Sequence, residues 1–163
     1  LEFRRVLFRS STFVVELPLA AALGDVAQPS AARAPRTQGV HVLLAEDNPV
    51  NQEVARSLLE ILGVTVDVAD DGAAALRMAG ARDYDLVFMD VQMPVLDGLD
   101  ATAAIRALPG ARARVPIVAM TANAFDEDRR RCLEAGMSDH LSKPVQMEAL
   151  EACLARWLGE RDG

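Results

Sequence analysis

The chain has 163 residues, of which 51% are apolar, and its formal net charge is −7. This length and apolar content allow one domain with a sizeable core, whereas an acidic chain is a poor binder of nucleic acid. The apolar stretch at residues 13–23 is broken by Glu16 and Pro18 and is shorter than the ~20 residues of a membrane-spanning helix, so we expect a cytoplasmic chain without membrane contact.

Charge and composition divide the chain near residue 39. Residues 1–39 carry a formal charge of +2, and residues 40–163 carry −9. Residues 21–39 are rich in alanine, proline and arginine, which predicts a flexible linker. We therefore expect the folded domain at residues 40–160.

After the linker, apolar runs alternate with helical patterns. The runs VLLA, LVFM and IVAM are continuously apolar, which is typical of strands buried on both faces of a parallel sheet. Five strand–helix units in series predict a doubly wound α/β fold with a five-stranded parallel sheet and five helices. The predicted strands are residues 40–45, 65–69, 86–89, 115–120 and 140–142, and the predicted helices are residues 49–62, 72–79, 99–108, 125–135 and 147–158.

The first and last helices have the clearest local signals. Asn48 can cap the first helix, and Pro49 suits its first position. Both helices also show an apolar face of the kind that packs on a core. These faces consist of Val50, Val54, Leu58 and Ile61 in the first helix and of Met147, Leu150, Leu154 and Trp157 in the last.

Acidic residues follow two of the predicted strands. Glu46 and Asp47 come directly after the first strand, and Asp90 comes directly after the third. The carboxyl ends of parallel strands lie at one edge of a sheet, so the three carboxylates meet there if these strands are neighbours. Oxygen ligands without histidine or cysteine favour a hard cation, and we expect Mg²⁺. Solvated loop acids are the alternative for Glu46 and Asp47 alone, but the matching position of Asp90 disfavours it.

A hydroxyl and an ammonium are expected at the same edge. Thr121 closes the fourth strand, and Lys143, the only lysine in the chain, closes the fifth. An ionised carboxylate is a competent nucleophile towards phosphorus, and a lysine ammonium is a mobile point charge that can pair with a phosphoryl oxygen. The set therefore predicts a phosphoryl site, with Pro144 as a candidate cis peptide that aims Lys143 inward.

Four motifs now identify a family. The segments VLLAEDN, DLVFMDVQMPVLDG, IVAMTA and LSKP occur in this order at the predicted strand ends. They resemble the receiver domain of two-component response regulators, which implies the flavodoxin-like strand order 2-1-3-4-5. The resemblance also implies a role for each site residue: Asp90 as phosphoacceptor, Asp47, Asp90 and the backbone carbonyl of Gln92 as Mg²⁺ ligands, Glu46 acting on Mg²⁺ through water, Lys143 as the phosphoryl contact, and Thr121 with the backbone N–H of Ala122 as the switch.

One position departs from the family pattern. His140 stands where the family generally has tyrosine or phenylalanine, three residues before the lysine. Imidazole is smaller than these rings, polar and titratable near neutral pH. The coupling of phosphorylation to the output surface could differ here, although a tolerated substitution is the simpler interpretation.

The N-terminal region resembles a different part of the same signalling systems. Residues 11–20, STFVVELPLA, are similar to the last strand of the ATPase domain of histidine kinases, and EDNPVNQ is most like the receivers of hybrid sensor kinases. Residues 1–10 fit neither pattern, stay unassigned, and are suspected to be non-native. The resemblance implies a parent hybrid kinase whose catalytic part is absent from this sequence.

The expected function is phosphorelay signal transduction. A phosphohistidine on a histidine kinase would donate to Asp90, and the group would pass to a histidine phosphotransfer protein or feed back on the kinase. The receiver would then be a phosphoacceptor and not a turnover enzyme. Two alternatives stay open: an aspartyl-phosphate hydrolase of the haloacid dehalogenase type, which is disfavoured because Gln92 replaces its general acid, and a degenerate receiver that acts without phosphorylation.

Overall fold

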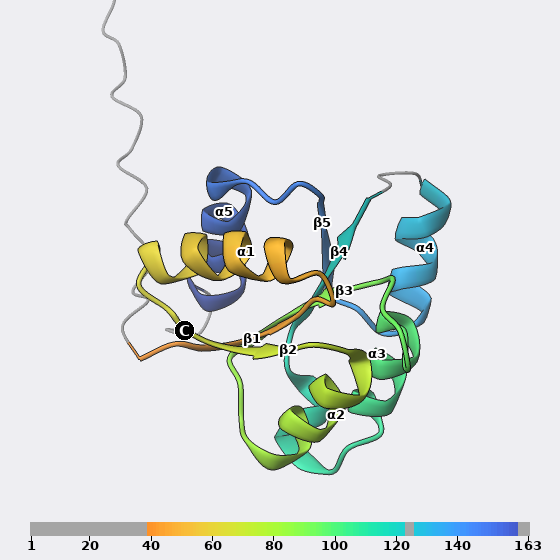
Figure 1. Cartoon of the computed structure of the whole chain (residues 1–163). Coiled ribbons are helices and arrows are strands. Elements are labelled where there is room, and N and C mark those ends of the chain that lie inside the picture. The colour runs from red at the N-terminus through yellow and green to blue at the C-terminus, as the bar shows by residue number, and fades with distance from the viewer. Residues whose placement is uncertain (1–38, 123–125, 160–163) are drawn as a thin grey trace, which may run out of the picture. The chain divides into compact units, whose positions relative to one another are not determined.

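The computed structural model describes residues 39–122 and 126–159, which form a parallel sheet covered by helices on both faces (Figure 1). The strand order is β2-β1-β3-β4-β5, and every neighbouring pair is parallel, which confirms the predicted fold class. The proposed assignments of residues 1–10 and 11–20, and nearly all of the linker at 21–39, lie outside the described residues. The strands are β1 (His41–Ala45), β2 (Thr65–Ala69), β3 (Leu86–Asp90), β4 (Ile117–Thr121) and β5 (Asp139–Ser142).

The five predicted helices are present, with ends that differ from the predicted ends by at most two residues. A short 3₁₀ helix, η1 (Gly110–Arg114), was not predicted, because its sequence GARAR has no apolar periodicity. Within the described part of the chain, none of the helices is long and apolar enough to cross a membrane. The helices are α1 (Pro49–Ile61), α2 (Gly72–Ala81), α3 (Gly98–Arg106), α4 (Asp126–Glu134) and α5 (Met147–Gly159).

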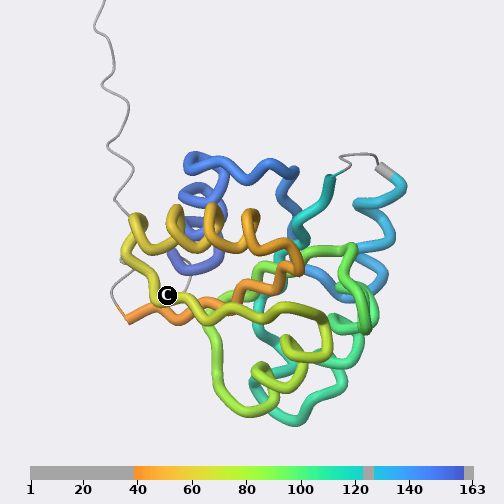
Figure 2. The backbone as a smooth tube through the Cα atoms, in the orientation of Figure 1, coloured from red at the N-terminus to blue at the C-terminus, as the bar shows by residue number. Residues whose placement is uncertain are grey.

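The sheet separates two apolar cores. Alternate residues of β3 point into opposite layers: Val87 and Met89 belong to the core under α2 and α3, whereas Leu86 and Phe88 belong to the core under α1 and α5. The chain path in Figure 2 shows the same pairing of α1 with α5 on one face and of α2 with α3 on the other. Burial on both faces explains why the strands are continuously apolar.

The predicted core-facing side of α1 is wrong for three of its four residues, and only Leu58 packs against the core. Val50, Val54 and Ile61 are 69%, 51% and 72% exposed, whereas Ala55 and Leu59 are buried. The helix is rotated because Ala55 and Leu59 pack on the sheet while the amides that follow Val50 reach the end of β1. The exposed residues Val50, Val54 and Ile61, called the α1 stripe below, therefore face outward. In α5 the expected side is buried, with Leu150 and Leu154 in the core and Trp157 packed against it.

The loop after β3 depends on one glycine. The main-chain N–H of Gly98 donates to the carbonyl of Val91 at 3.0 Å, and a Cβ at this position would collide with the carbonyl of Asp90. Asp97 caps the helix that follows, since its Oδ1 accepts a hydrogen bond from the N–H of Asp100 at 2.9 Å. Glycine at position 98 thus lets α3 begin directly against the end of β3.

A half-buried arginine ties α3 to two neighbouring segments. Arg106 Nε donates to the carbonyl of Gly136 at 2.8 Å, and Nη1 donates to the carbonyls of Ala113 at 2.9 Å and Val115 at 2.8 Å. Burial lowers the pKa of the Arg106 guanidinium. These bonds connect the end of α3 with η1 and with the loop before β5, so the planar fork of arginine serves a structural role here.

The first prediction concerns this arginine. Replacing it in the variant Arg106→Leu should lower the free energy of unfolding by about 3 kcal/mol, because three main-chain carbonyls lose a charged donor. Urea denaturation measures the change. The control is Arg56→Ala, which removes an exposed arginine paired with Glu60 one helical turn away; exposed pairs of this kind contribute little. Equal losses in the two variants would contradict the structural role of Arg106.

Candidate functional site

Three acids gather at the carboxyl end of the sheet. Glu46 and Asp47 directly follow β1, and Asp90 is the last residue of the neighbouring strand β3. Carboxylate oxygens of the three residues lie within 4.8 Å of one another. They line a cleft of about 600 Å³. The strand-end pattern in the sequence therefore correctly placed these acids together.

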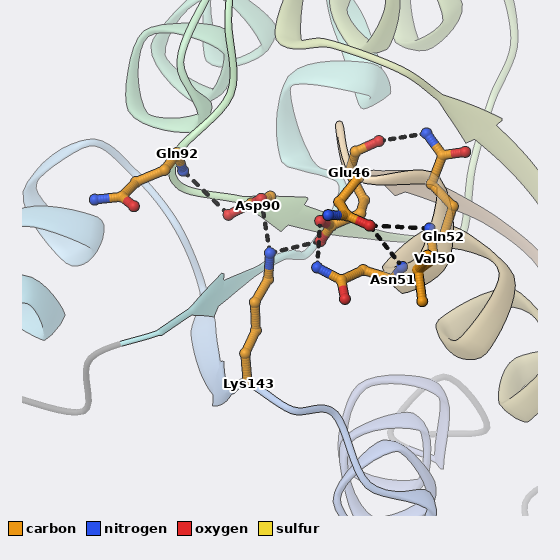
Figure 3. A network of polar contacts seen from close by, with 8 residues as sticks. Glu46, Val50, Asn51, Gln52, Asp90, Gln92 and Lys143 are labelled. Carbon is orange, nitrogen blue, oxygen red and sulfur yellow. Dashed lines mark hydrogen bonds and ion pairs between the residues drawn. The ribbon is translucent and has the colours of Figure 1, made fainter.

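The lysine lies between two of these acids (Figure 3). Lys143 Nζ is 2.7 Å from Asp90 Oδ2 and 2.6 Å from Glu46 Oε2. Its main-chain N–H donates to the carbonyl of Thr121 at 2.8 Å, which fixes the end of β5 against β4. The Lys143–Pro144 peptide bond is cis. The ammonium is thus held in the cleft by one contact from Glu46, directly after β1, and one from Asp90 at the end of β3.

Burial and ion pairing act on both charges. Burial raises the pKa of Asp90, and this effect exceeds the lowering by Lys143 and by the main-chain N–H of Gln92, which donates to Asp90 Oδ1 at 3.1 Å. Burial acts to lower the pKa of Lys143, but its bonds to Asp90 and Glu46 outweigh burial and raise it. The ammonium therefore stays charged, while the ionised form of Asp90 costs the fold some stability.

The acids fit a hard cation. Three carboxylates in one cleft face a single ammonium, which leaves a negative excess that a divalent ion would neutralise. The side chain of Asp47 is exposed to the cleft, whereas Glu46 is 2% exposed and already contacts Lys143. Asp47 and Asp90 are accordingly the side chains best disposed to hold a metal directly, and all available donors are oxygens.

Two amides near the acids were not singled out by the sequence; Asn51 lines the cleft, whereas Gln52 is not among the described residues that line it. Asn51 Nδ2 donates to Glu46 Oε1 at 2.9 Å. Gln52 Nε2 donates to the main-chain carbonyl of Glu46 at 2.6 Å and to Asp70 Oδ1 at 3.0 Å. The available signal was the pair of adjacent amides in the first turn of a helix that starts just after the acids.

The predicted switch residues occupy two different places. Thr121, which is buried, and Ala122, which is exposed, line the cleft together with Gln92. His140 instead lines a separate pocket between α4 and α5, where its side chain is 28% exposed and its Nδ1 is 3.7 Å from Asp139 Oδ1. Among the described residues that line the acidic cleft, His140 does not occur.

Comparison with known proteins finds one family. The model of the response regulator receiver domain matches residues 42–155. The sensor protein GacS of Pseudomonas syringae pv. syringae is 41% identical over 137 residues, which cover 83% of this chain and 15% of GacS. The aerobic respiration control sensor protein ArcB of Escherichia coli is 43% identical over 123 residues, which cover 76% of this chain and 16% of ArcB. The chain thus spans less than a fifth of these relatives.

Solved structures give the same result. The receiver domain of sensor histidine kinase PA1611 from Pseudomonas aeruginosa, with a magnesium ion in its active-site cleft, is 49% identical with a TM-score of 0.70, covering 74% of this chain and 98% of that one. The receiver domain of Ssk1 from Saccharomyces cerevisiae, crystallised with the histidine phosphotransfer protein Ypd1, is 33% identical with a TM-score of 0.69, covering 75% and 90%.

The raised pKa of Asp90 generates a prediction about stability. The pKa of an aspartate carboxyl in the unfolded chain is about 3.9. When the pKa is higher in the folded state, the contribution of the carboxyl to stability is complete at a pH below the unfolded-state pKa. It is lost as the pH rises through the folded-state pKa. In a metal chelator, Asp90→Asn should therefore be more stable than the wild type at neutral pH, and the difference should close below about pH 4. Urea titrations across this range measure it. Glu151→Gln, at an exposed position on α5, should show no such gap. A variant less stable than the wild type at neutral pH would mean that the ion pair with Lys143 outweighs burial.

Proposed function

Because this chain belongs to the response regulator receiver domain family, we propose that Asp90 accepts the phosphoryl group of a phosphohistidine. The observation that carries the proposal is the contact of the only lysine ammonium with this strand-end carboxylate, 2.7 Å away, inside a cleft rich in acids. An ammonium in this place neutralises charge that develops on a transferring phosphoryl group.

The reaction would proceed by displacement at phosphorus. A carboxylate oxygen of Asp90 attacks, a P–O bond forms, the P–N bond to the donor imidazole breaks, and the electron pair of that bond stays on the imidazole nitrogen. The N–H of Gln92, 3.1 Å from Oδ1, orients the carboxylate. Lys143, already 2.7 Å from Oδ2, moves its contact to a phosphoryl oxygen. The product is an acyl phosphate on Asp90.

Mg²⁺ is the cofactor we assign to this cleft. Asp47, Asp90 and the main-chain carbonyl of Gln92 would hold it, with Glu46 acting through water. A bound divalent cation would neutralise charge on the phosphoryl oxygens. Support comes from the excess of carboxylates in the cleft and from the magnesium ion in the related PA1611 receiver.

The added charge would operate the switch. A phosphoryl group brings about −1.5 to −2 charge, which the hydroxyl of Thr121 and the backbone N–H of Ala122 would approach from the end of β4. Both residues line the cleft. The movement would shift the equilibrium between two states of the segment that leads into α4.

The partners we assign are a histidine kinase, as donor, and a histidine phosphotransfer protein. The parent protein would be a hybrid kinase, as the GacS and ArcB relatives suggest. The α1 stripe offers a docking surface for a helix that carries the reacting histidine, because its apolar residues are exposed and Val50 and Val54 lie in the half of α1 nearest the cleft. Val54 also lines a small pocket of about 140 Å³ with Pro144 and Val145, next to Lys143.

The phosphoryl-transfer chemistry is tested with acetyl phosphate as donor. We expect the wild type to gain one phosphoryl group by intact mass only when Mg²⁺ is present, and Asp90→Asn to gain none. Lack of any gain in folded wild-type protein would favour a degenerate receiver. Continuous release of inorganic phosphate at a high rate would favour the hydrolase.

The docking surface is tested by separating transfer between proteins from intrinsic reactivity. Val54→Asp should lower the rate of transfer from a phosphorylated histidine phosphotransfer protein about tenfold, while the reaction with acetyl phosphate stays close to that of the wild type. The matched control is Leu133→Asp on α4, since Val54 and Leu133 are 51% and 53% exposed. Equal effects of the two variants would exclude α1 as the docking surface.

A further inference from the structure

Glu46 is a buried carboxylate whose two oxygens have different partners. Its side chain is 2% exposed. Oε2 lies 2.6 Å from Lys143 Nζ, and Oε1 accepts a hydrogen bond from Asn51 Nδ2 at 2.9 Å. One partner is the mobile cation of the reaction, whereas the other is a neutral amide on α1 (Figure 3). The three residues form a continuous row that lines both the acidic cleft and the smaller pocket beside it.

The start of α1 fixes the amide in this row. Asn48 Oδ1 accepts hydrogen bonds from the N–H groups of Val50 at 2.9 Å and Asn51 at 3.3 Å. The cap therefore holds the main chain of Asn51, while the side chain of Asn51 reaches back to Glu46. A residue anchored at both ends can keep a neighbouring carboxylate in one orientation.

We propose that Asn51 is a positioning residue for phosphoryl transfer, acting through Glu46 on Lys143. This role rests on the proposed function. The ammonium is shared between Glu46 and Asp90, with N–O distances of 2.6 and 2.7 Å. For Lys143 to follow the phosphoryl group, the contact between its ammonium and Glu46 must weaken. The amide of Asn51 remains on Glu46 throughout, so this buried carboxylate keeps a donor when the ammonium moves.

Loss of Asn51 would change the competition for the lysine. A Glu46 side chain without its amide partner would depend on Lys143 alone and would hold the ammonium away from Asp90. The chemical step would become slower. Binding of the phosphodonor would change little, because Asn51 acts on Lys143 through Glu46 and not on the donor. The role therefore predicts an effect on the maximal rate more than on the half-saturating donor concentration.

The neighbouring amide provides a matched control. Gln52 also donates to Glu46, but to its main-chain carbonyl, and to Asp70 Oδ1. Gln52→Ala thus removes an amide from the same helical turn and a hydrogen bond to the same residue without touching the carboxylate. Asn51→Ala removes the donor to the carboxylate, and Asn51→Asp keeps the side-chain shape but cannot donate.

The experiment uses the fact that Lys143 is the only lysine of the chain. Labelling with lysine that carries ¹⁵N at Nζ gives one side-chain ammonium resonance, which reports directly on the row. We expect Asn51→Ala and Asn51→Asp to shift or broaden this resonance and to lower the maximal rate of phosphorylation by acetyl phosphate, at saturating Mg²⁺, about tenfold. Gln52→Ala should leave the resonance in place and the rate within about twofold.

The outcomes separate this role from the proposed function. Phosphorylation of the wild type together with unchanged resonance and rate in both Asn51 variants would overturn the role of Asn51 and leave the proposed function standing. Equal slowing by the Asn51 and Gln52 variants, without movement of the resonance, would show a structural effect only and would also overturn it. Absence of phosphorylation in the wild type would overturn the proposed function and the role of Asn51 with it.

Discussion

The ammonium of Lys143, shared between two buried carboxylates, is the interaction on which the cleft depends. Glu46 and Asp90 lie at the ends of neighbouring strands, and without a cation between them their charges would repel at short range in a poorly solvated place. The sheet brings the acids together, and the lysine makes that proximity tolerable. Because one ammonium only partly neutralises the two carboxylates, the cleft can bind further positive charge. In the proposed reaction this charge would be the metal ion that accompanies the phosphoryl group.

Two partly buried cations show how the chain uses different chemistry for different tasks. Arg106 spreads its planar guanidinium over main-chain carbonyls from three residues and thereby joins α3, η1 and the loop before β5. Lys143 presents a compact charge on a flexible stem to two carboxylates. A fork suits fixed acceptors, whereas a point charge can follow an anion that moves. The single lysine among sixteen arginines therefore stands at the position where the proposed phosphoryl transfer requires a cation that moves.

Helix α1 combines three functions along its length. Asn48 caps the helix and the amide of Asn51 contacts Glu46 after β1. The buried residues Ala55 and Leu59 pack on the sheet, and the α1 stripe faces outward. The same rotation of the helix thus serves both the contact with Glu46 and the proposed docking surface.

The sequence by itself determined the order of strands and helices, because continuously apolar runs and helical spacing are local properties, and it placed Glu46, Asp47, Asp90, Thr121 and Lys143 at one edge, because parallel strands end there together. Which face of α1 packs on the sheet was decided only by the tertiary structure. Two overlapping apolar faces, one with Val54 and one with Leu59, satisfy the same periodicity, and only contacts with the sheet and with Glu46 select between them. The carbonyl partners of Arg106 and the carboxylate partner of Asn51 escaped prediction for a related reason, since a single side-chain hydrogen bond leaves no periodic trace in the chain.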